Sequence, residues 1–261
     1  MKIIVCIKQV PDSTEVRLDP ETNTLIREGV PSIVNPFDLY AVEEALRIKE
    51  RCGGMVTALT MGPPQAESAL RDVVAMGVDE AALLSDRAFA GSDTLATSYA
   101  LAQAVRTLGG ADLIICGKQA IDGDTAQVGP GVAEQLGIPF VAFVGKVAQV
   151  GDGTMVVHRL MEDGHDVVEL QLPALITVVK EINEPRLPSL RGKMKAKSIQ
   201  IRRLNAQDVG GDPGRYGLKG SPTQVWRTFT PEPRGAGEVF SGEPEEAAAA
   251  LVARLRESKV L

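Results

Sequence analysis

The chain contains few of the residues on which metal-dependent, disulfide-bonded or nucleic-acid-binding proteins depend. Its 261 residues include only 2 histidines and 3 cysteines, and their spacing forms no CxxC pair or zinc motif. Aromatic residues make up 4%, so we do not expect an aromatic surface that stacks bases. Asp and Glu outnumber Lys and Arg by 34 to 28, which argues against general nucleic-acid binding. Any redox chemistry must therefore come from a bound organic cofactor.

Long apolar runs are also missing from the sequence. No run approaches the roughly 18–20 residues of a membrane-spanning helix, and the first residues, MKIIVCIK, lack the pattern of a signal peptide. Unpaired cysteines in or beside apolar runs favour a reducing compartment. We expect a cytoplasmic protein without a membrane span.

The first two thirds of the chain alternate short β-branched runs with longer helical patterns. The predicted strands are residues 2–8, 56–61, 81–85 and 111–117. The predicted helices begin at Pro36, with Asn35 as the N-cap, near Pro64, near Asp93 and at Pro130, and end near residues 52, 77, 108 and 137. This alternation predicts an α/β fold with a mostly parallel, doubly wound, Rossmann-like sheet.

The sequence pattern changes after residue 138. Four β-rich runs separated by GDG and EDG turns suggest antiparallel additions to the sheet, the last run being ALITVVK. Residues 181–197 are broken by prolines and are not expected to be regular, and residues 207–243 are predicted to form an extended arm before an amphipathic helix at 243–259. We expect a nucleotide-binding domain over residues 1–206 and an arm and helix over 207–261 that embrace a partner chain.

The most informative local feature is the segment from Cys116 to Gly137, which leaves a strand, forms a polar loop and enters a helix. Parallel sheets bind ligands at the carboxyl ends of their strands, where helix N-termini offer free N–H groups. Gly123 allows close backbone approach, and polar side chains such as Asp122 and Thr125 could bond a ribose, diphosphate or base. The alternative is a polar loop that merely caps a helix.

Other segments should reach the same edge of the sheet. They are Gln9–Pro11, Asn35–Asp38, Met61–Pro64 and the helix start that carries Asp93, Thr94 and Thr97. The chain has no GxGxxG fingerprint and no P-loop. Each segment alone could be structural, but together they favour a nucleotide site with its own geometry.

No nucleophile–base constellation is recognisable in the sequence. His158 lies in a predicted strand and His165 in a predicted turn, and neither belongs to a catalytic motif. We therefore expect no catalytic side chain and no metal site. The pattern favours binding or electron carriage over hydrolysis or group transfer.

Four motifs carry a family resemblance: VCIKQVPD, NPFDLYAVEEALRIKE, GKQAIDGDTAQVGP and NEPRLPSLRGKMKAK. Over essentially the whole chain, the sequence resembles the β subunit of electron-transfer flavoprotein. The resemblance implies an α/β nucleotide-binding domain that pairs with an α subunit carrying the electron-transferring FAD. Ordinary β subunits hold a structural AMP, whereas in the electron-bifurcating branch a second FAD takes that place.

The resemblance also implies which residues bind the cofactor and the partners. The matching adenylate contacts are Cys6, Asn35, Pro36, Phe37, Asp38, Met61, Gly117, Lys118, Gln119, Ala120, Ile121, Asp122, Gly123, Asp124, Thr125, Ala126, Gln127 and Val128. In the bifurcating branch, Asp93, Thr94 and Thr97 would hold the diphosphate or ribityl chain of the flavin. Residues 181–197 match the recognition loop for dehydrogenases, with Leu190 as the apolar anchor and Arg191, Lys195 and Lys197 as basic neighbours.

The branch is indicated by three segments, DGDTAQVGP, GSDTLATS and GSPTQVWRTFTPEP, which resemble the bifurcating members. That branch implies FAD in the β subunit, NADH as hydride donor, ferredoxin or flavodoxin as one acceptor, and an acyl-CoA dehydrogenase-type partner reached through the α-subunit FAD. Such a protein is an electron carrier with NADH-oxidising flavin activity. An ordinary β subunit with AMP is the alternative. A nucleotide-binding stress-type or ATP-hydrolysing domain is disfavoured, because it would leave the recognition-like loop and the arm unexplained.

The net charge of −6 conceals a basic segment. Between Arg186 and Arg203 there are seven basic residues and no acidic residue. A local charge of this sign suits the steering of an acidic protein partner.

Overall fold

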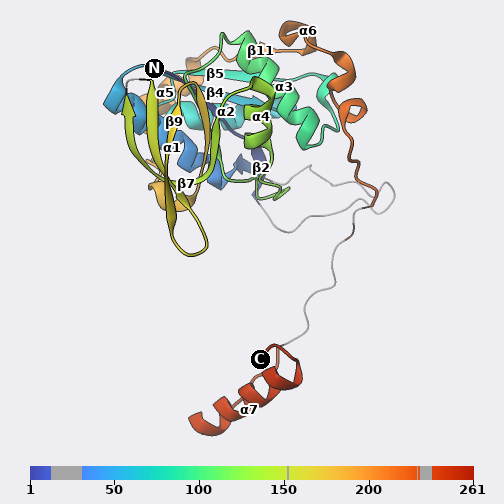
Figure 1. Cartoon of the computed structure of the whole chain (residues 1–261). Helices are drawn as coiled ribbons and strands as arrows, with labels where there is room; N and C mark the ends of the chain where they lie inside the picture. Colours follow the sequence, from blue (N-terminus) through green and yellow to red (C-terminus); the bar gives the residue numbers. More distant parts are fainter. Residues whose placement is uncertain (13–30, 152, 228, 230–236) are drawn as a thin grey trace. The chain divides into compact units, whose positions relative to one another are not determined.

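The computed structural model describes residues 1–12, 31–151, 153–227, 229 and 237–261. The described residues form two compact units, a larger one up to residue 226 and a smaller one from residue 227 onward (Figure 1). The larger unit contains the strands found in the described residues and the helices α1 to α6. The smaller unit contains α7 (Pro244–Glu257), which lies within the helix predicted for residues 243–259.

A nine-stranded sheet forms the centre of the larger unit, with the order β11-β5-β4-β1-β6-β10-β7-β8-β9. Its strands are β1 (Lys2–Cys6), β4 (Met55–Met61), β5 (Glu80–Leu84), β6 (Leu113–Gly117), β7 (Phe140–Gly151), β8 (Thr154–Leu160), β9 (His165–Gln171), β10 (Ala174–Val178) and β11 (Arg202–Leu204). The pairs from β11 to β7 are parallel, and β7, β8 and β9 pair antiparallel. The four predicted strands and the mostly parallel sheet are confirmed. A separate antiparallel pair joins β2 (Gln9–Pro11) to β3 (Ser32–Val34).

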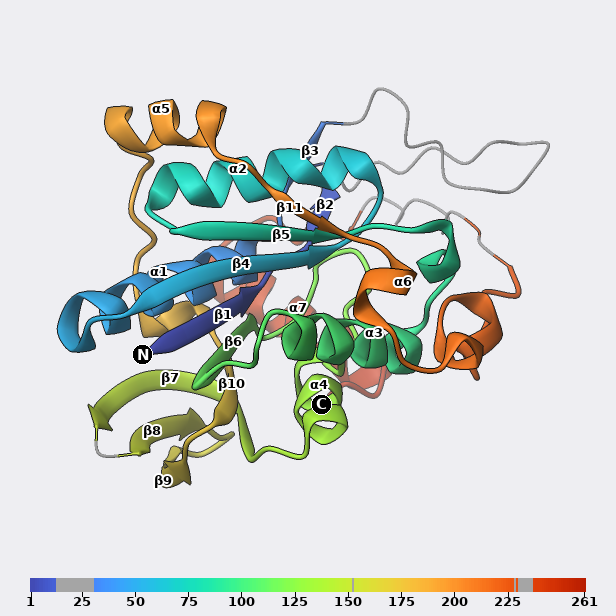
Figure 2. The ribbon, with the colours of Figure 1, turned by 90° about the horizontal axis from the view of Figure 1, so that it is seen from above.

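Helices cover both faces of the sheet, as expected for a doubly wound fold (Figure 2). The helices of the larger unit are α1 (Pro36–Cys52), α2 (Glu67–Met76), α3 (Thr94–Thr107), α4 (Val128–Leu136), α5 (Leu190–Ser198) and α6 (Ala206–Val209). Alternate residues of β1 divide the core, because Ile3 and Val5 pack with α1 and α2 whereas Ile4 and Cys6 pack with α3 and α4. The four helices predicted in this region are confirmed, although α4 begins two residues before Pro130.

Two predictions for the second half of the larger unit were wrong. The run ALITVVK is not part of the antiparallel extension: β10 lies between β6 and β7 and is parallel to both. All five of its residues are buried, which suits a central strand covered on both faces. Residues 190–198 form the helix α5 rather than an irregular loop. Its prolines precede the helix, and the Ser189 side chain caps it by accepting a hydrogen bond from Gly192 N at 2.9 Å.

The arm predicted from residue 207 is not extended in its first part. Residues 206–220 form α6 and two 3₁₀ turns, Pro213–Arg215 and Leu218–Gly220. The buried Tyr216 ring lies 5.1 Å from the Phe89 ring and 5.3 Å from the Tyr99 ring, centroid to centroid. Aromatic packing therefore holds this segment against α3.

Among the described residues, no helix combines the length and the apolar character needed to cross a membrane. The same part of the chain has no group of three or more His, Cys, Asp or Glu side chains placed to hold a metal ion. Cys6, Cys52 and Cys116 are free thiols.

Candidate functional site

The candidate site lies at the carboxyl ends of β1 and β6, the position at which doubly wound sheets form a ligand-binding crevice. The chain passes from β1 to β4 on one side and later returns to β6 on the other side of β1, so the strand order reverses between β1 and β6. Open parallel sheets bind nucleotides at such a reversal. Lys8 follows β1, and the loop of residues 118–127, here called the β6 loop, follows β6. Its first backbone N–H, from Lys118, is bonded to Val178 O at 2.9 Å.

Asn35, the residue before α1, anchors the β6 loop through two side-chain hydrogen bonds. Its side chain is fully buried, and its Nδ2 donates to Gln119 O at 2.8 Å while its Oδ1 accepts from Ile121 N at 3.1 Å. Asn35 is the N-cap residue of α1, as predicted, but its side chain makes no capping hydrogen bond. The amide is instead used by the loop, so Asn35 shapes the site rather than offering its side chain to a ligand.

Asp38 joins the ends of the two central strands. Its Oδ2 accepts from Lys8 N at 2.7 Å. A Cβ on Gly117 would lie 2.3 Å from Asp38 Oδ1, so only glycine allows this approach. Burial raises the pKa of Asp38 to about 7, although hydrogen bonds from Asn35 and from the backbone of Lys8 and Gly117 act in the opposite direction. The Asp38 carboxyl group is therefore a structural link at the strand reversal.

Two lysines bring positive charge to the crevice. Lys8 Nζ lies 2.6 Å from Asp122 Oδ1 in the β6 loop, and Lys118 Nζ lies 5.3 Å from the centre of the Phe37 ring. Sequence reasoning did not select Lys8 as a site residue. The available signal was its position, a basic residue immediately after a buried strand that ends at the nucleotide edge.

The β6 loop has an unusual backbone. Asp124 and Ala126 have φ angles of 53° and 55°, which place two non-glycine residues in the left-handed region. Asp124 N bonds to Ala120 O at 2.8 Å, and the Gln119 side chain donates to the Asp124 carboxylate. A Cβ on Gly123 would have no described atom within 4 Å, so the space beside it is open. Strained residues of this kind concentrate at ligand-binding loops.

The N-terminus of α4 follows this loop and packs tightly on the sheet. A Cβ on Gly129 would lie 2.6 Å from Thr177 Cγ2, so the small residue brings the first turn of the helix onto β10. No side chain caps the helix at Gln127. Uncapped N–H groups at a helix N-terminus favour an anion such as a phosphate.

A second helix start, that of α3, is joined to the β6 loop. Thr94 Oγ1 donates to Gln127 Oε1 at 3.2 Å. The Asp93 carboxylate caps α3 through Leu95 N and Ala96 N, each at 3.0 Å, and its other oxygen accepts from Thr223 N at 3.1 Å and Thr223 Oγ1 at 2.8 Å. Asp93 is thus engaged by the protein, whereas Thr94 lies at the crevice.

The remaining predicted contacts differ in exposure. Cys6 and Cys116 are opposite each other on β1 and β6, and both are buried. A hydrogen bond from Cys6, together with burial, raises the pKa of the Cys116 thiol, so the thiol stays neutral. Met61, at the end of β4, is partly buried. Thr97 lies one turn inside α3. These residues lie at or near the strand ends and the helix start that border the candidate site.

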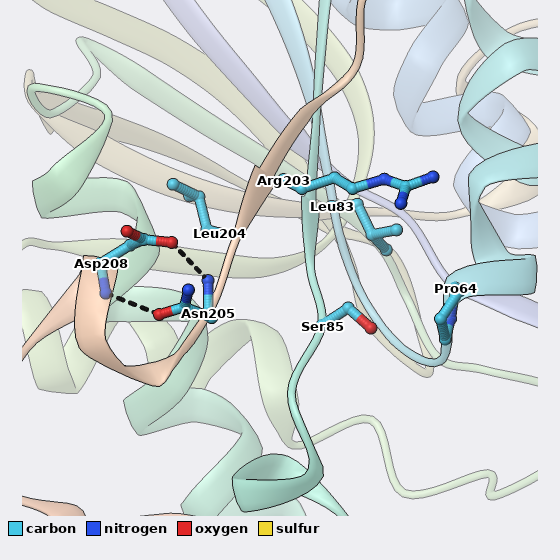
Figure 3. Close-up of a pocket in the computed structure, with 7 residues that line it drawn as sticks. All are labelled: Pro64, Leu83, Ser85, Arg203, Leu204, Asn205 and Asp208. Carbon is cyan, nitrogen blue, oxygen red and sulfur yellow. Dashed lines mark hydrogen bonds between the residues drawn. The ribbon is translucent and has the colours of Figure 1, made fainter.

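A separate pocket of about 230 Å³ lies by the end of β5, next to β11 (Figure 3). Its lining residues are Pro64, Leu83, Ser85, Arg203, Leu204, Asn205 and Asp208. Asn205 and Asp208 are used by each other in the cap of α6, at 2.8 and 3.0 Å, and Arg203 is paired with Glu67 at 2.7 Å. The side chains of Arg203, Asn205 and Asp208 are therefore already engaged by the protein.

The residues predicted to dock a partner lie on α5. The side chain of Leu190 is 79% exposed, and Met194, one turn later, is also exposed. Arg191, Lys195 and Lys197 are all exposed, and Lys195 Nζ also donates to Val78 O at 3.0 Å, which holds α5 to the end of α2. A Cβ on Gly192 would lie 2.0 Å from Ala75 O, so this glycine allows α5 to rest directly on α2.

Comparison with known proteins agrees with this geometry. The electron transfer flavoprotein domain matches residues 22–209. The chain belongs to the electron transfer flavoprotein β subunit family. It is 54% identical, over the whole of both chains, to the electron transfer flavoprotein subunit beta of Thermoanaerobacterium thermosaccharolyticum. It is 51% identical, again over both whole chains, to the caffeyl-CoA reductase-Etf complex subunit CarD of Acetobacterium woodii. Protein FixA of Bradyrhizobium diazoefficiens is 48% identical, with 97% of this chain and 90% of that protein covered.

Membership in the family has three general consequences. The chain acts in electron transfer, it is associated with a flavin or nucleotide, and its partner is an α subunit.

Proposed function

We propose that this electron transfer flavoprotein β subunit binds FAD in the crevice between β1 and β6. The observation that carries the proposal is a cluster of hydrogen bonds. Thr94 is bonded to Gln127, and Asp93 is bonded to Thr223 and, through its own N–H at 2.8 Å, to Ser221 Oγ. Residues from each of the three segments that resemble the bifurcating branch, with the third represented by Ser221 and Thr223, are therefore linked by hydrogen bonds beside the β6 loop.

Residues of the chain would bind the cofactor in distinct ways. Asn35 and Asp38 hold the β6 loop and the strand ends in place. The uncapped start of α4, together with Lys8 and Lys118, would neutralise the diphosphate. Thr94 and Thr97 would contact the diphosphate or the ribityl chain. Because the binding groups are fixed before the cofactor arrives, little conformational entropy is lost on binding.

The redox chemistry belongs to the cofactor. When bound, FAD would supply hydride and single-electron chemistry, with NADH as the hydride donor, ferredoxin or flavodoxin as one electron acceptor, and an acyl-CoA dehydrogenase-type partner, reached through the α-subunit FAD, as the other. The name of the Acetobacterium woodii relative, which refers to a caffeyl-CoA reductase complex, supports a partner that acts on acyl-CoA. We propose that Leu190 and the basic residues of α5 dock that partner.

An ordinary β subunit with a structural AMP is the second candidate. One observation favours it: the Asp93 carboxylate is already occupied by the cap of α3 and by Thr223, so it is not available to the flavin half of FAD. The adenylate half would use the same β6 loop in both cases.

The deciding experiment counts cofactors in the purified complex with the α subunit. Two FAD per heterodimer, with bleaching of the β-subunit flavin by NADH, is the expected result. One FAD and one AMP per heterodimer would contradict the proposal and establish the second candidate.

We also propose that the C-terminal segment embraces the α subunit. Val225, Trp226 and Phe229 are exposed apolar side chains, and α7 exposes Leu251 and Val252. Burying such residues requires a partner surface. The free thiols support a reducing, cytoplasmic location.

A further inference from the structure

The segment that leads to α5 is fastened to α1 by one arginine. Arg186 Nε donates to Glu43 Oε2 at 2.8 Å, and its terminal nitrogens reach Glu43 Oε1 at 3.2 Å and Glu50 at 2.5 and 3.1 Å. The backbone N–H of Arg186 also donates to Glu43 Oε2, at 3.1 Å. One planar guanidinium therefore bridges two carboxylates that lie seven residues apart on the same helix.

This contact is not an ordinary surface ion pair. The Glu43 side chain is only 4% exposed. Its burial opposes ionisation, but hydrogen bonds from Arg186 and Arg47 outweigh that effect and lower the pKa of Glu43. The hydrogen bonds to Glu50 and Glu43 raise the pKa of Arg186. Charge-assisted, bidentate contacts with a buried carboxylate are strong and directional, unlike pairs between two exposed side chains.

Neighbouring contacts secure the same segment. Arg47, which pairs with Glu43 at 2.6 Å, also donates to Glu184 O at 3.3 Å. The Asn183 side chain donates to Tyr40 O at 3.0 Å and to Glu44 Oε2 at 3.2 Å. The polar side of α1 thus holds residues 183–186 through contacts that run from Tyr40 to Glu50, nearly three turns of helix.

The residues that follow the segment held by α1 are exposed. Leu187 is 88% exposed, and Leu190 opens α5 three residues later. Without these contacts to α1, the exposed segment would sample many conformations. The entropy lost when a partner orders it would then reduce the affinity for that partner. The ionic contacts also neutralise Arg186, so this residue contributes less to the basic docking charge than its place in the sequence suggests.

We propose that Arg186 is a positioning residue for partner docking: it holds Leu187–Leu190 in the conformation that the dehydrogenase recognises. The inference rests on the proposed docking role of Leu190. Arg186 acts through the backbone that it fixes and need not touch the partner.

The test uses the heterodimer with its α subunit and a purified acyl-CoA dehydrogenase reduced by butyryl-CoA. We expect Arg186→Ala to raise the KM for the dehydrogenase about tenfold, equivalent to ~1.4 kcal/mol, with kcat at saturating dehydrogenase unchanged. The cofactor content should stay as in the wild type. Amide hydrogen exchange of residues 183–190 should become faster.

Three further variants sharpen the test. Arg186→Lys keeps the charge but cannot bridge two carboxylates with a planar fork, so it should restore the KM only in part. Glu50→Gln removes one partner from an exposed position and should give a smaller rise in KM even if Arg186→Ala does not fold. Lys49→Ala is the matched control, because it removes a cation and the 2.7 Å pair with Asp79 from α1 without touching residues 183–190.

The Leu190→Ala variant distinguishes the positioning role of Arg186 from the docking role of Leu190. A raised KM for Leu190→Ala together with wild-type values for Arg186→Ala and Glu50→Gln would overturn the positioning role and leave docking intact. A wild-type KM for Leu190→Ala would overturn the proposed docking itself. A lower melting temperature for Arg186→Ala with an unchanged KM would show that the contact serves stability alone.

Discussion

The Asn35 side chain spans two residues of the β6 loop, donating to Gln119 O at 2.8 Å and accepting from Ile121 N at 3.1 Å. Both hydrogen bonds are partly buried and join residues more than 80 positions apart in the sequence. A carboxamide is the group that offers a donor and an acceptor side by side. The shape of the loop therefore depends on a residue that gives no side-chain atom to a ligand.

The first prediction concerns this amide. Asn35→Ala removes both hydrogen bonds and leaves two backbone groups of the β6 loop unsatisfied, a cost of about 1–3 kcal/mol each. Asn35→Asp keeps the acceptor but turns a carboxylate oxygen toward Gln119 O. We expect both variants to lose most of the bound nucleotide, measured as FAD and AMP released per heterodimer. Asn205→Ala is the control, because it removes another structural asparagine, the cap of α6. Full nucleotide content in Asn35→Ala would contradict the positioning role.

The second prediction concerns the ion pair between Lys8 and Asp122. Asp122→Ala releases the loop end of the 2.6 Å contact and should lower nucleotide content. The KM for the dehydrogenase should not change, because α5 lies on α2. Lys8→Ala should have a similar effect, and the double variant should lose less than the sum of the two, as expected for partners in direct contact. Strictly additive losses would mean that the two side chains act separately.

The third prediction concerns the exposed anchor of α5. Leu190→Ala removes an apolar side chain that no described neighbour buries, so the stability of the protein should change by less than ~0.5 kcal/mol. Electron transfer with the dehydrogenase should weaken by roughly tenfold or more, because buried apolar anchors dominate docking energies. Flavin content should stay unchanged. Loss of flavin in this variant would show that the docking assignment is wrong.

The fourth prediction concerns pH. The pKa of Asp38 is about 7 in the folded protein and near 3.8 when exposed, so the folded state binds more protons between these values. The free energy of unfolding should therefore fall as the pH rises from about 4 to about 7, by at most ~1.4 kcal/mol per pH unit from this group. The stabilisation that Asp38 contributes is complete below about pH 3.8 and is lost above about pH 7.

Urea unfolding at several pH values between 5 and 8 measures this slope. Asp38→Asn is the comparison, because it cannot titrate and should lack the contribution. Glu43 and Glu50, whose pKa values are lowered, contribute in the opposite sense and only below about pH 4.5. An equal slope in the wild type and in Asp38→Asn would mean that Asp38 does not titrate in this range.

The parts of the fold that sequence reasoning predicted correctly are those with a local signal. The helix α1 has a proline at its first position, an acid in its first turn and basic residues in its last. The β-branched runs of β1 and β6 are an equally clear local signal for buried strands. The position of β10 was missed, because a fully apolar strand looks the same whether its neighbours are parallel or antiparallel.

The candidate site shows the same division. Sequence reasoning selected Asn35, Asp38 and the β6 loop, but it could not separate residues that face a ligand from residues that hold the loop. That distinction depends on contacts between distant parts of the chain, such as Asn35 with Ile121. The helix α5 was missed because Pro185 and Pro188 dominate the local pattern, although they end before the helix begins.

The placement of β10 has a consequence for how the chain assembles. β10 is synthesised after β7, β8 and β9 but lies between β6 and β7. The strands β7, β8 and β9 can therefore join the central sheet only after β10 has been synthesised. A nascent chain that stops before residue 174 would carry open strand edges on both β6 and β7, the kind of edge that promotes aggregation. Val178 O also accepts the hydrogen bond from Lys118 N, the first N–H of the β6 loop. A ribosome-bound chain should therefore gain its nucleotide only after residue 178 has emerged.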